Sequence, residues 1–139
     1  MPDSIRVREV ILKEMLAQAR RKPEMECCGL LAGRNGVITE ILPGTNSLAS
    51  PTAYEIAPGE LFEMFRFLRA EGLTHLGQYH SHPSTDNVPS PTDIEQAGYP
   101  DQAYFIVSPR AGALNPVRAF FIRDGVVQET EIIVTETKE

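Results

Sequence analysis

The sequence lacks the features typical of membrane, secreted and nucleic-acid-binding proteins. None of its apolar runs approaches the roughly 20 residues that span a bilayer as a helix, and Met1–Ser4 carry no charged-then-apolar signal pattern. Thirteen basic residues against nineteen acidic ones give a net charge of −6, and there is no basic stripe. Because nucleic-acid binding favours the opposite balance, we expect neither a nucleic acid nor a membrane as a partner.

Cysteine is also scarce: the two cysteines, Cys27 and Cys28, are neighbours in the chain. Adjacent cysteines rarely pair with one another, and two thiols cannot staple a secreted scaffold together. The sequence shows no internal repeat and no low-complexity segment. With 139 residues, of which 42% are hydrophobic, the chain has the size of one domain with one core. We therefore expect a single domain over residues 1–139 in the reducing cytoplasm.

Two stretches show the apolar periodicity of α-helices. The first covers Glu9–Arg21, and the second begins near Pro58 and stops at Gly72. A third, short helix is expected to begin at Ser90-Pro91-Thr92-Asp93, because serine caps a helix, proline fits its first turn, and an acid three residues after the cap completes a capping box. The second helix is expected to bury four side chains: Leu61, Phe62, Phe65 and Leu68.

Shorter apolar runs predict β-strands around these helices. The expected strands are Ile5–Val7, Cys27–Ala32, Val37–Leu42, Leu76–His82, Tyr104–Val107, Val117–Ile122 and Val126–Val134. Asn35-Gly36 and Asp124-Gly125 predict tight turns, the Gly-, Pro- and Ser-rich stretch 43–58 predicts a long surface loop, and the polar end 135–139 is expected to fray. The pattern is that of an α/β domain with a mixed, mostly antiparallel sheet flanked by helices.

The most informative residues are two of the three histidines, His80 and His82, and the aspartate Asp93 that follows after ten intervening residues, 83–92. Side chains at positions i and i+2 of a strand share one face, so the two imidazoles project together and Ser81 points away. Asp93, in the first turn of the next helix, can bring its carboxylate to the same point. Two imidazoles and one carboxylate suit one Zn²⁺ ion that keeps a position open for water.

Other interpretations of these residues stay open at this point. The same donors resemble the facial triad of iron oxygenases, so ligand type alone does not exclude iron. In a protein without a metal, Ser90 and Asp93 would be a capping pair and the two histidines a surface feature. Cupin and zincin sites are excluded because no histidine follows His82, and the Pro-Cys-x-x-Cys pair of zinc deaminases is absent. The third histidine, His75, is expected in a turn or on the surface.

The spacing of these residues resembles the signature of the JAMM (MPN-plus) metalloproteases. That signature is a glutamate followed, further along the chain, by His-Ser/Thr-His-Pro, a serine and an aspartate at fixed spacing; His80, His82, Ser90 and Asp93 match it. Glu26, in Glu26-Cys27-Cys28-Gly29, matches the glutamate and lies 53 residues (27–79) ahead of His80. The resemblance covers nearly the whole chain and implies a single MPN/JAMM domain with a layered architecture like that of the cytidine deaminases.

The resemblance also implies a role for each residue. Zinc held by His80, His82 and Asp93 would polarise a water molecule. Glu26 is not a ligand, and the family pattern places it on a strand. It would take the proton of this water and pass it to the leaving amine. Ser90 would donate a hydrogen bond to the oxyanion.

Three other conspicuous side chains are expected to serve packing. Cys28 would share a face with Glu26 if the strand is regular, but a small thiol there is typical of a core position. Tyr54 and Tyr79 are also expected to pack rather than to take part in chemistry.

Finally, the resemblance implies a substrate. JAMM enzymes cut peptide or isopeptide bonds after the C-terminal glycine of ubiquitin-like proteins, and this short chain is similar to the minimal prokaryotic form that acts on ThiS/MoaD-like sulfur carriers. A Gly-Gly tail can add to a sheet edge and approach a metal closely, and we expect the loops 43–58 and 85–89 to flank it. Two alternatives remain: a catalytically silent MPN scaffold, although such members usually lose metal ligands that this chain keeps, and a small-molecule amidohydrolase using the same site.

Overall fold

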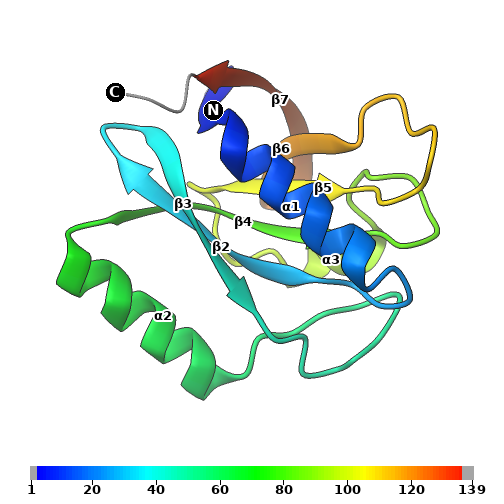
Figure 1. Ribbon diagram of the computed structural model, residues 1–139, viewed down its shortest axis with the longest axis horizontal. Coiled ribbons are helices and arrows are strands. Elements are labelled where there is room, and N and C mark those ends of the chain that lie inside the picture. The colour runs from blue at the N-terminus through cyan, green and yellow to red at the C-terminus, as the bar shows by residue number, and fades with distance from the viewer. Residues whose placement is uncertain (1–2, 136–139) are drawn as a thin grey trace.

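The computed structural model describes residues 3–135 as an α/β fold (Figure 1). The elements are β1 (Ser4–Arg8), α1 (Glu9–Arg21), β2 (Cys28–Arg34), β3 (Val37–Gly44), α2 (Pro58–Glu71), β4 (Thr74–Ser81), α3 (Pro91–Gln96), β5 (Ala103–Val107), β6 (Val117–Arg123) and β7 (Val126–Thr135). Within this part of the chain no helix combines the length and the apolar character needed to cross a membrane.

The seven strands form one sheet in the order β1-β3-β2-β4-β5-β6-β7, which closes because β7 also pairs with β1. Four pairings are antiparallel and three are parallel, which confirms the predicted mixed, mostly antiparallel sheet flanked by helices. The layering that the resemblance implied stays a prediction, and the structure adds the closure of the sheet. Its physical cause is β1, which pairs in parallel with both β3 and β7 and so joins the two edges.

The local predictions agree closely with the observed elements. The first helix has the predicted bounds, and Asn35 and Gly36 turn the β2–β3 hairpin with φ of 55° and 76°, as a two-residue turn of this kind requires. Gly72 ends α2 in the left-handed conformation with φ of 69°. The long loop is shorter than predicted and spans 45–57, because β3 continues to Gly44. Of the segment expected to fray, 136–139 lies outside the described residues.

The two faces of the sheet pack against different parts of the molecule. On one face Tyr79 and Phe105 lie in the main core together with Met15 of α1, and all three side chains are fully buried, as expected for Tyr79. Because side chains alternate along a strand, Gln78 and His80 of β4 project from the opposite face. The candidate site is therefore separated from α1 by the sheet.

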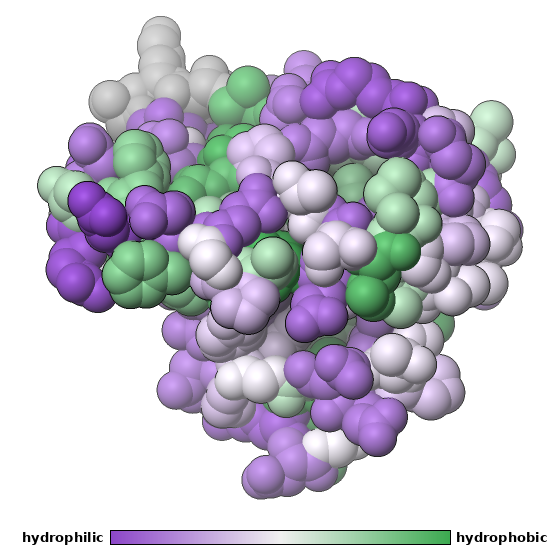
Figure 2. Space-filling model, turned by 90° about the horizontal axis from the view of Figure 1, so that it is seen from below, coloured by the Kyte–Doolittle hydropathy of each residue, from purple (hydrophilic) through white to green (hydrophobic). Residues whose placement is uncertain are grey.

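The buried face of α2 differs from the prediction. Met64 and Leu68 are buried, whereas Phe62, predicted to be a core residue, is 63% exposed. Consecutive helix residues are about 100° apart, so Phe62, two positions before Met64, lies on the opposite side of the helix. Phe65 is only half-buried. Figure 2, which views the molecule from the side of α2, shows mostly hydrophilic residues with hydrophobic ones in small separate groups.

Candidate functional site

Strand β4 carries the two histidines to one side of the sheet. His80 lies in the strand and is 1% exposed, and His82, one residue beyond its end, is 3% exposed. The His82 N–H donates to the carbonyl of Val107 at 2.9 Å, which continues the pairing with β5. Ser81 points the other way, and its hydroxyl oxygen accepts a hydrogen bond from the Cys27 N–H at 2.9 Å. The predicted alternation is therefore present.

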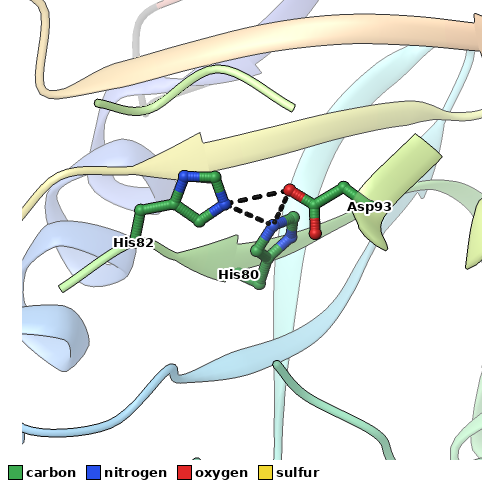
Figure 3. Close-up of side chains that lie close together, drawn as sticks. All are labelled: His80, His82 and Asp93. Carbon is green, nitrogen blue, oxygen red and sulfur yellow. Dashed lines mark hydrogen bonds and ion pairs between the residues drawn. The ribbon is translucent and has the colours of Figure 1, made fainter. Parts of the chain in front are cut away.

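Helix α3 brings Asp93 to the histidines, and its capping box positions the carboxylate. The Ser90 hydroxyl oxygen accepts from the Asp93 N–H at 3.0 Å, and Asp93 Oδ2 accepts from the Ser90 N–H at 3.0 Å, as predicted. The same Oδ2 lies 2.9 Å from His82 Nε2 and 3.1 Å from His80 Nε2 (Figure 3). The two Nε2 atoms are 3.2 Å apart.

This arrangement has the donor set and the spacing that a divalent metal ion needs. One donor atom from each of His80, His82 and Asp93 lies within 4.8 Å of the others. The His82 ring directs Nδ1 at the carbonyl of Asp86, 2.8 Å away, and a neutral His82 with its proton on Nδ1 would offer the Nε2 lone pair to a metal. Two imidazoles and one carboxylate are typical ligands of zinc. The three residues thus fit a zinc ion.

The charges of two of the three residues, Asp93 and His80, suit metal binding. Burial raises the pKa of Asp93, but hydrogen bonds from His80 and His82 outweigh this and hold it well below its usual range. Burial lowers the pKa of His80. In His82 burial acts in the same direction, but the hydrogen bonds with Asp93 and with the Asp86 carbonyl outweigh it and raise the pKa. The carboxylate is therefore ionised and His80 neutral, the protonation states of metal ligands, whereas His82 holds its proton more readily and would release it on binding a metal.

Glu26 lies beside this cluster but not within a strand, because β2 begins two residues later. In the antiparallel β2–β4 pair Cys28 lies opposite His80, and extending this register by two residues places Glu26 opposite His82. Glu26 is 3% exposed, and its Oε1 has no hydrogen-bond partner among residues 3–135. Burial raises its pKa to about 8, which the charge of His82 opposes and that of Asp93 reinforces. Such a carboxyl group can accept and release a proton near neutral pH.

The loop 45–57 holds the backbone of Glu26 through a residue that the sequence analysis did not find. The Glu26 N–H donates to the carbonyl of Ser50 at 2.9 Å. The amide of the buried Asn46 donates to the carbonyls of Glu26 at 3.1 Å and of Ala53 at 3.0 Å, and its Oδ1 accepts from two further N–H groups of the loop. An asparagine in a polar loop is typical of any turn, so only the fold distinguishes Asn46.

We expect Asn46→Ala to lower the free energy of unfolding by about 3 kcal/mol, because one buried and three part-buried backbone groups lose their partner. Urea denaturation of the metal-free protein measures this effect. Ser47→Ala is the matched control, since the Ser47 hydroxyl donates to the Glu55 carbonyl of the same loop at 2.9 Å but is exposed. Its change should stay within about 0.5 kcal/mol. Equal effects of the two substitutions would contradict the structural role of Asn46.

A cavity of about 220 Å³ borders His80 and Asp93. Residues 53–56 of the loop, the start of α2 and parts of α3 form its walls, whereas residues 85–89, also expected to flank a substrate, are not among them. The ring of Tyr54 stacks on that of His80 with centroids 4.7 Å apart and planes inclined by 23°. Tyr54 thus packs, as expected, but its packing partner is a candidate ligand.

Cys28 and His75 lie near the site without joining the cluster. Cys28 is 1% exposed, as expected for a small core residue, and burial raises the pKa of its thiol to about 12. His75 is half-buried rather than on the surface: its Nε2 lies 2.9 Å from Gln78 Oε1, and its ring meets two aromatic rings edge to face.

The chain is similar in sequence and in fold to known proteins. Residues 8–123 match the family described as prokaryotic homologs of the JAB domain. A CysO-cysteine peptidase of Mycobacterium tuberculosis is 36% identical over 132 residues, which cover 94% of this chain and 90% of that protein. A desampylase of Haloferax volcanii is 39% identical over 105 residues, or 73% of this chain and 76% of that protein. The solution structure of a Desulfitobacterium hafniense protein, 33% identical, matches with a TM-score of 0.82 over 95% of this chain and 93% of that one.

Proposed function

Because this chain belongs to the family of prokaryotic homologs of the JAB domain, the JAMM proteins, and is a peptidase, we propose that it is a zinc-dependent peptidase or isopeptidase that cuts after the C-terminal glycine of a ubiquitin-like sulfur-carrier protein. The observation that carries this proposal is the convergence of His80, His82 and Asp93 within 4.8 Å beside the buried carboxyl group of Glu26. The names of the two relatives, CysO-cysteine peptidase and desampylase, support the class of reaction.

In the proposed mechanism His80, His82 and Asp93 would hold one zinc ion, which would supply Lewis acidity to a water molecule and to the scissile carbonyl. Glu26 takes a proton from the attacking water and passes it to the leaving amine, two tasks that suit a buried carboxyl group next to the candidate ligands. The hydroxyl oxygen of Ser90 accepts from the Asp93 N–H, which leaves the hydroxyl hydrogen to be donated to the developing oxyanion.

The cavity supports an extended glycine tail as the substrate. It borders His80 and Asp93, and side chains such as Leu30, Ile56 and Leu61 give it apolar walls. Glycine has no Cβ, so its backbone can come close to the donor atoms while the preceding tail residues occupy the cavity. The location that belongs to this proposal is the reducing cytoplasm, as expected from the scarcity of cysteine in the sequence.

Intact mass spectrometry of a cleavage reaction tests this function. Zinc-loaded protein is incubated with a sulfur-carrier protein that ends in Gly-Gly and is extended by one cysteine, and in parallel with a carrier joined through its terminal glycine to a lysine side chain. We expect loss of the added group and recovery of a carrier that ends in Gly-Gly. A protein that binds zinc but leaves both substrates intact would contradict the carrier as substrate and favour a small-molecule amidohydrolase. A protein that binds no zinc would contradict the zinc-dependent mechanism and favour a scaffold.

A further inference from the structure

The two candidate histidine ligands are held in different ways. The His82 ring is oriented by a hydrogen bond from Nδ1 to the carbonyl of Asp86 at 2.8 Å. The Nδ1 of His80 is buried and has no hydrogen-bond partner among the described residues 3–135. A histidine that binds a metal usually donates its second N–H to an acceptor, which fixes the orientation of the ring. For His80 the protein provides this orientation by some other contact.

The contact is the ring of Tyr54. The two rings stack with centroids 4.7 Å apart and planes inclined by 23°, within the range at which aromatic rings attract each other. On the sheet, Cys28 of β2 and Ile106 of β5 are the register partners of His80 and project from the same face. His80 is thus enclosed by its strand neighbours at the sides and by Tyr54 over its ring, and rotation of the imidazole would collide with Tyr54.

Tyr54 reaches His80 from an element with no other part in the cluster. It belongs to the loop 45–57, whose path is set by the hydrogen bonds of Asn46, including one to the carbonyl of Ala53 next to Tyr54. The stacking therefore links the conformation of this loop to the orientation of a candidate ligand.

We propose that Tyr54 is a positioning residue of the metal site, whose ring holds the His80 imidazole with Nε2 directed at Asp93 and His82. It does for His80 what the Asp86 carbonyl does for His82. This inference rests on the proposed zinc site and goes beyond it, because it makes the loop 45–57 a determinant of metal affinity. An aromatic ring at position 54 is required, and the phenol hydroxyl is not.

Zinc affinity and the visible spectrum of the cobalt-substituted protein test the inference in Tyr54→Leu and Tyr54→Phe. We expect Tyr54→Leu to bind zinc about tenfold more weakly, the lower end of the effect of losing a contact that orients a ligand, and to alter the cobalt spectrum. Tyr54→Phe should match the wild type in both. The matched control is Tyr99→Leu, which also removes an aromatic ring from the wall of this cavity. The ring of Tyr99 packs on His75 rather than on His80, so this substitution should leave zinc affinity unchanged.

An unchanged zinc affinity and cobalt spectrum in Tyr54→Leu would overturn the inference, and so would an equal loss in Tyr54→Phe. Should Tyr54→Leu fail to fold by circular dichroism, Tyr54→Met takes its place with the same expected loss. A wild type that binds no zinc would overturn both this inference and the proposed function. A wild type that binds zinc, with a leucine variant that binds it equally well, would overturn the inference alone.

Discussion

Glu26→Gln is expected to lower kcat/KM for cleavage of the carrier fusion by about 10²–10⁴-fold, the range of general acid–base catalysis, while zinc stays bound. Glutamine nearly keeps the shape of the side chain but can neither take a proton from water nor deliver one to the leaving amine. Because Glu26 is not among the three convergent donors, zinc affinity should change little. Steady-state kinetics and metal analysis of the same preparation measure both quantities.

Glu24→Gln is the matched control, since Glu24 is an exposed acid two residues before Glu26. It should keep full activity, because its carboxylate is not buried beside His82 and Asp93. Retained turnover in Glu26→Gln, or an equal loss in Glu24→Gln, would contradict the assignment of Glu26 as the proton carrier.

The same variant has a second expected effect, on stability. Burial raises the pKa of Glu26 from 4.5 to about 8, so the folded metal-free protein binds this proton more tightly than the unfolded chain does. The free energy of unfolding of the wild type therefore falls through this contribution as the pH rises between these values. Glutamine does not titrate, so metal-free Glu26→Gln should gain stability over the wild type from about pH 5 to about pH 8. Parallel pH curves of the two proteins would argue against a buried, shifted carboxyl group.

Asp93→Asn is expected to weaken zinc binding by at least about a hundredfold, more than the 10–100-fold typical of a lost outer contact, and to abolish cleavage with it. The amide is neutral and a poor zinc ligand, yet its oxygen can still accept the capping hydrogen bond from the Ser90 N–H. The loss should therefore reflect the metal rather than a damaged helix. Competition with a zinc-binding dye measures the affinity.

Asp86→Asn is the control for Asp93→Asn. Its carboxylate is exposed and paired with Arg110, while the backbone carbonyl that accepts from His82 is kept. Zinc binding and activity should match the wild type, because an exposed ion pair contributes at most about 1 kcal/mol to stability.

Removing zinc with a chelator should lower the stability of the wild type by about 2.7 kcal/mol relative to zinc at a hundred times its Kd, and leave Asp93→Asn unchanged. Zinc-dependent stabilisation of Asp93→Asn would contradict Asp93 as a ligand.

Features that depend on near neighbours could be predicted from the sequence. The capping box of Ser90 and Asp93 spans one helical turn, and the shared direction of His80 and His82 needs only the alternation of a strand. The bounds of α1 and the Asn35-Gly36 turn depend on local periodicity and backbone preference. The approach of Asp93 to the two histidines spans ten intervening residues, and it was predicted from donor chemistry and the family motif rather than from near neighbours.

Contacts between distant segments were decided only by the tertiary structure. Glu26 reaches the cluster because the β2–β4 register sets Cys28 opposite His80, and no local pattern specifies that register. Asn46 is buried, Phe62 exposed, and Tyr54 stacked on His80 because of how a loop and α2 pack against the sheet. The sequence by itself determined which side chains could bind zinc, since donor chemistry and short spacings are written along the chain. The closed sheet decided which residues surround and orient them, because packing joins residues that the sequence separates.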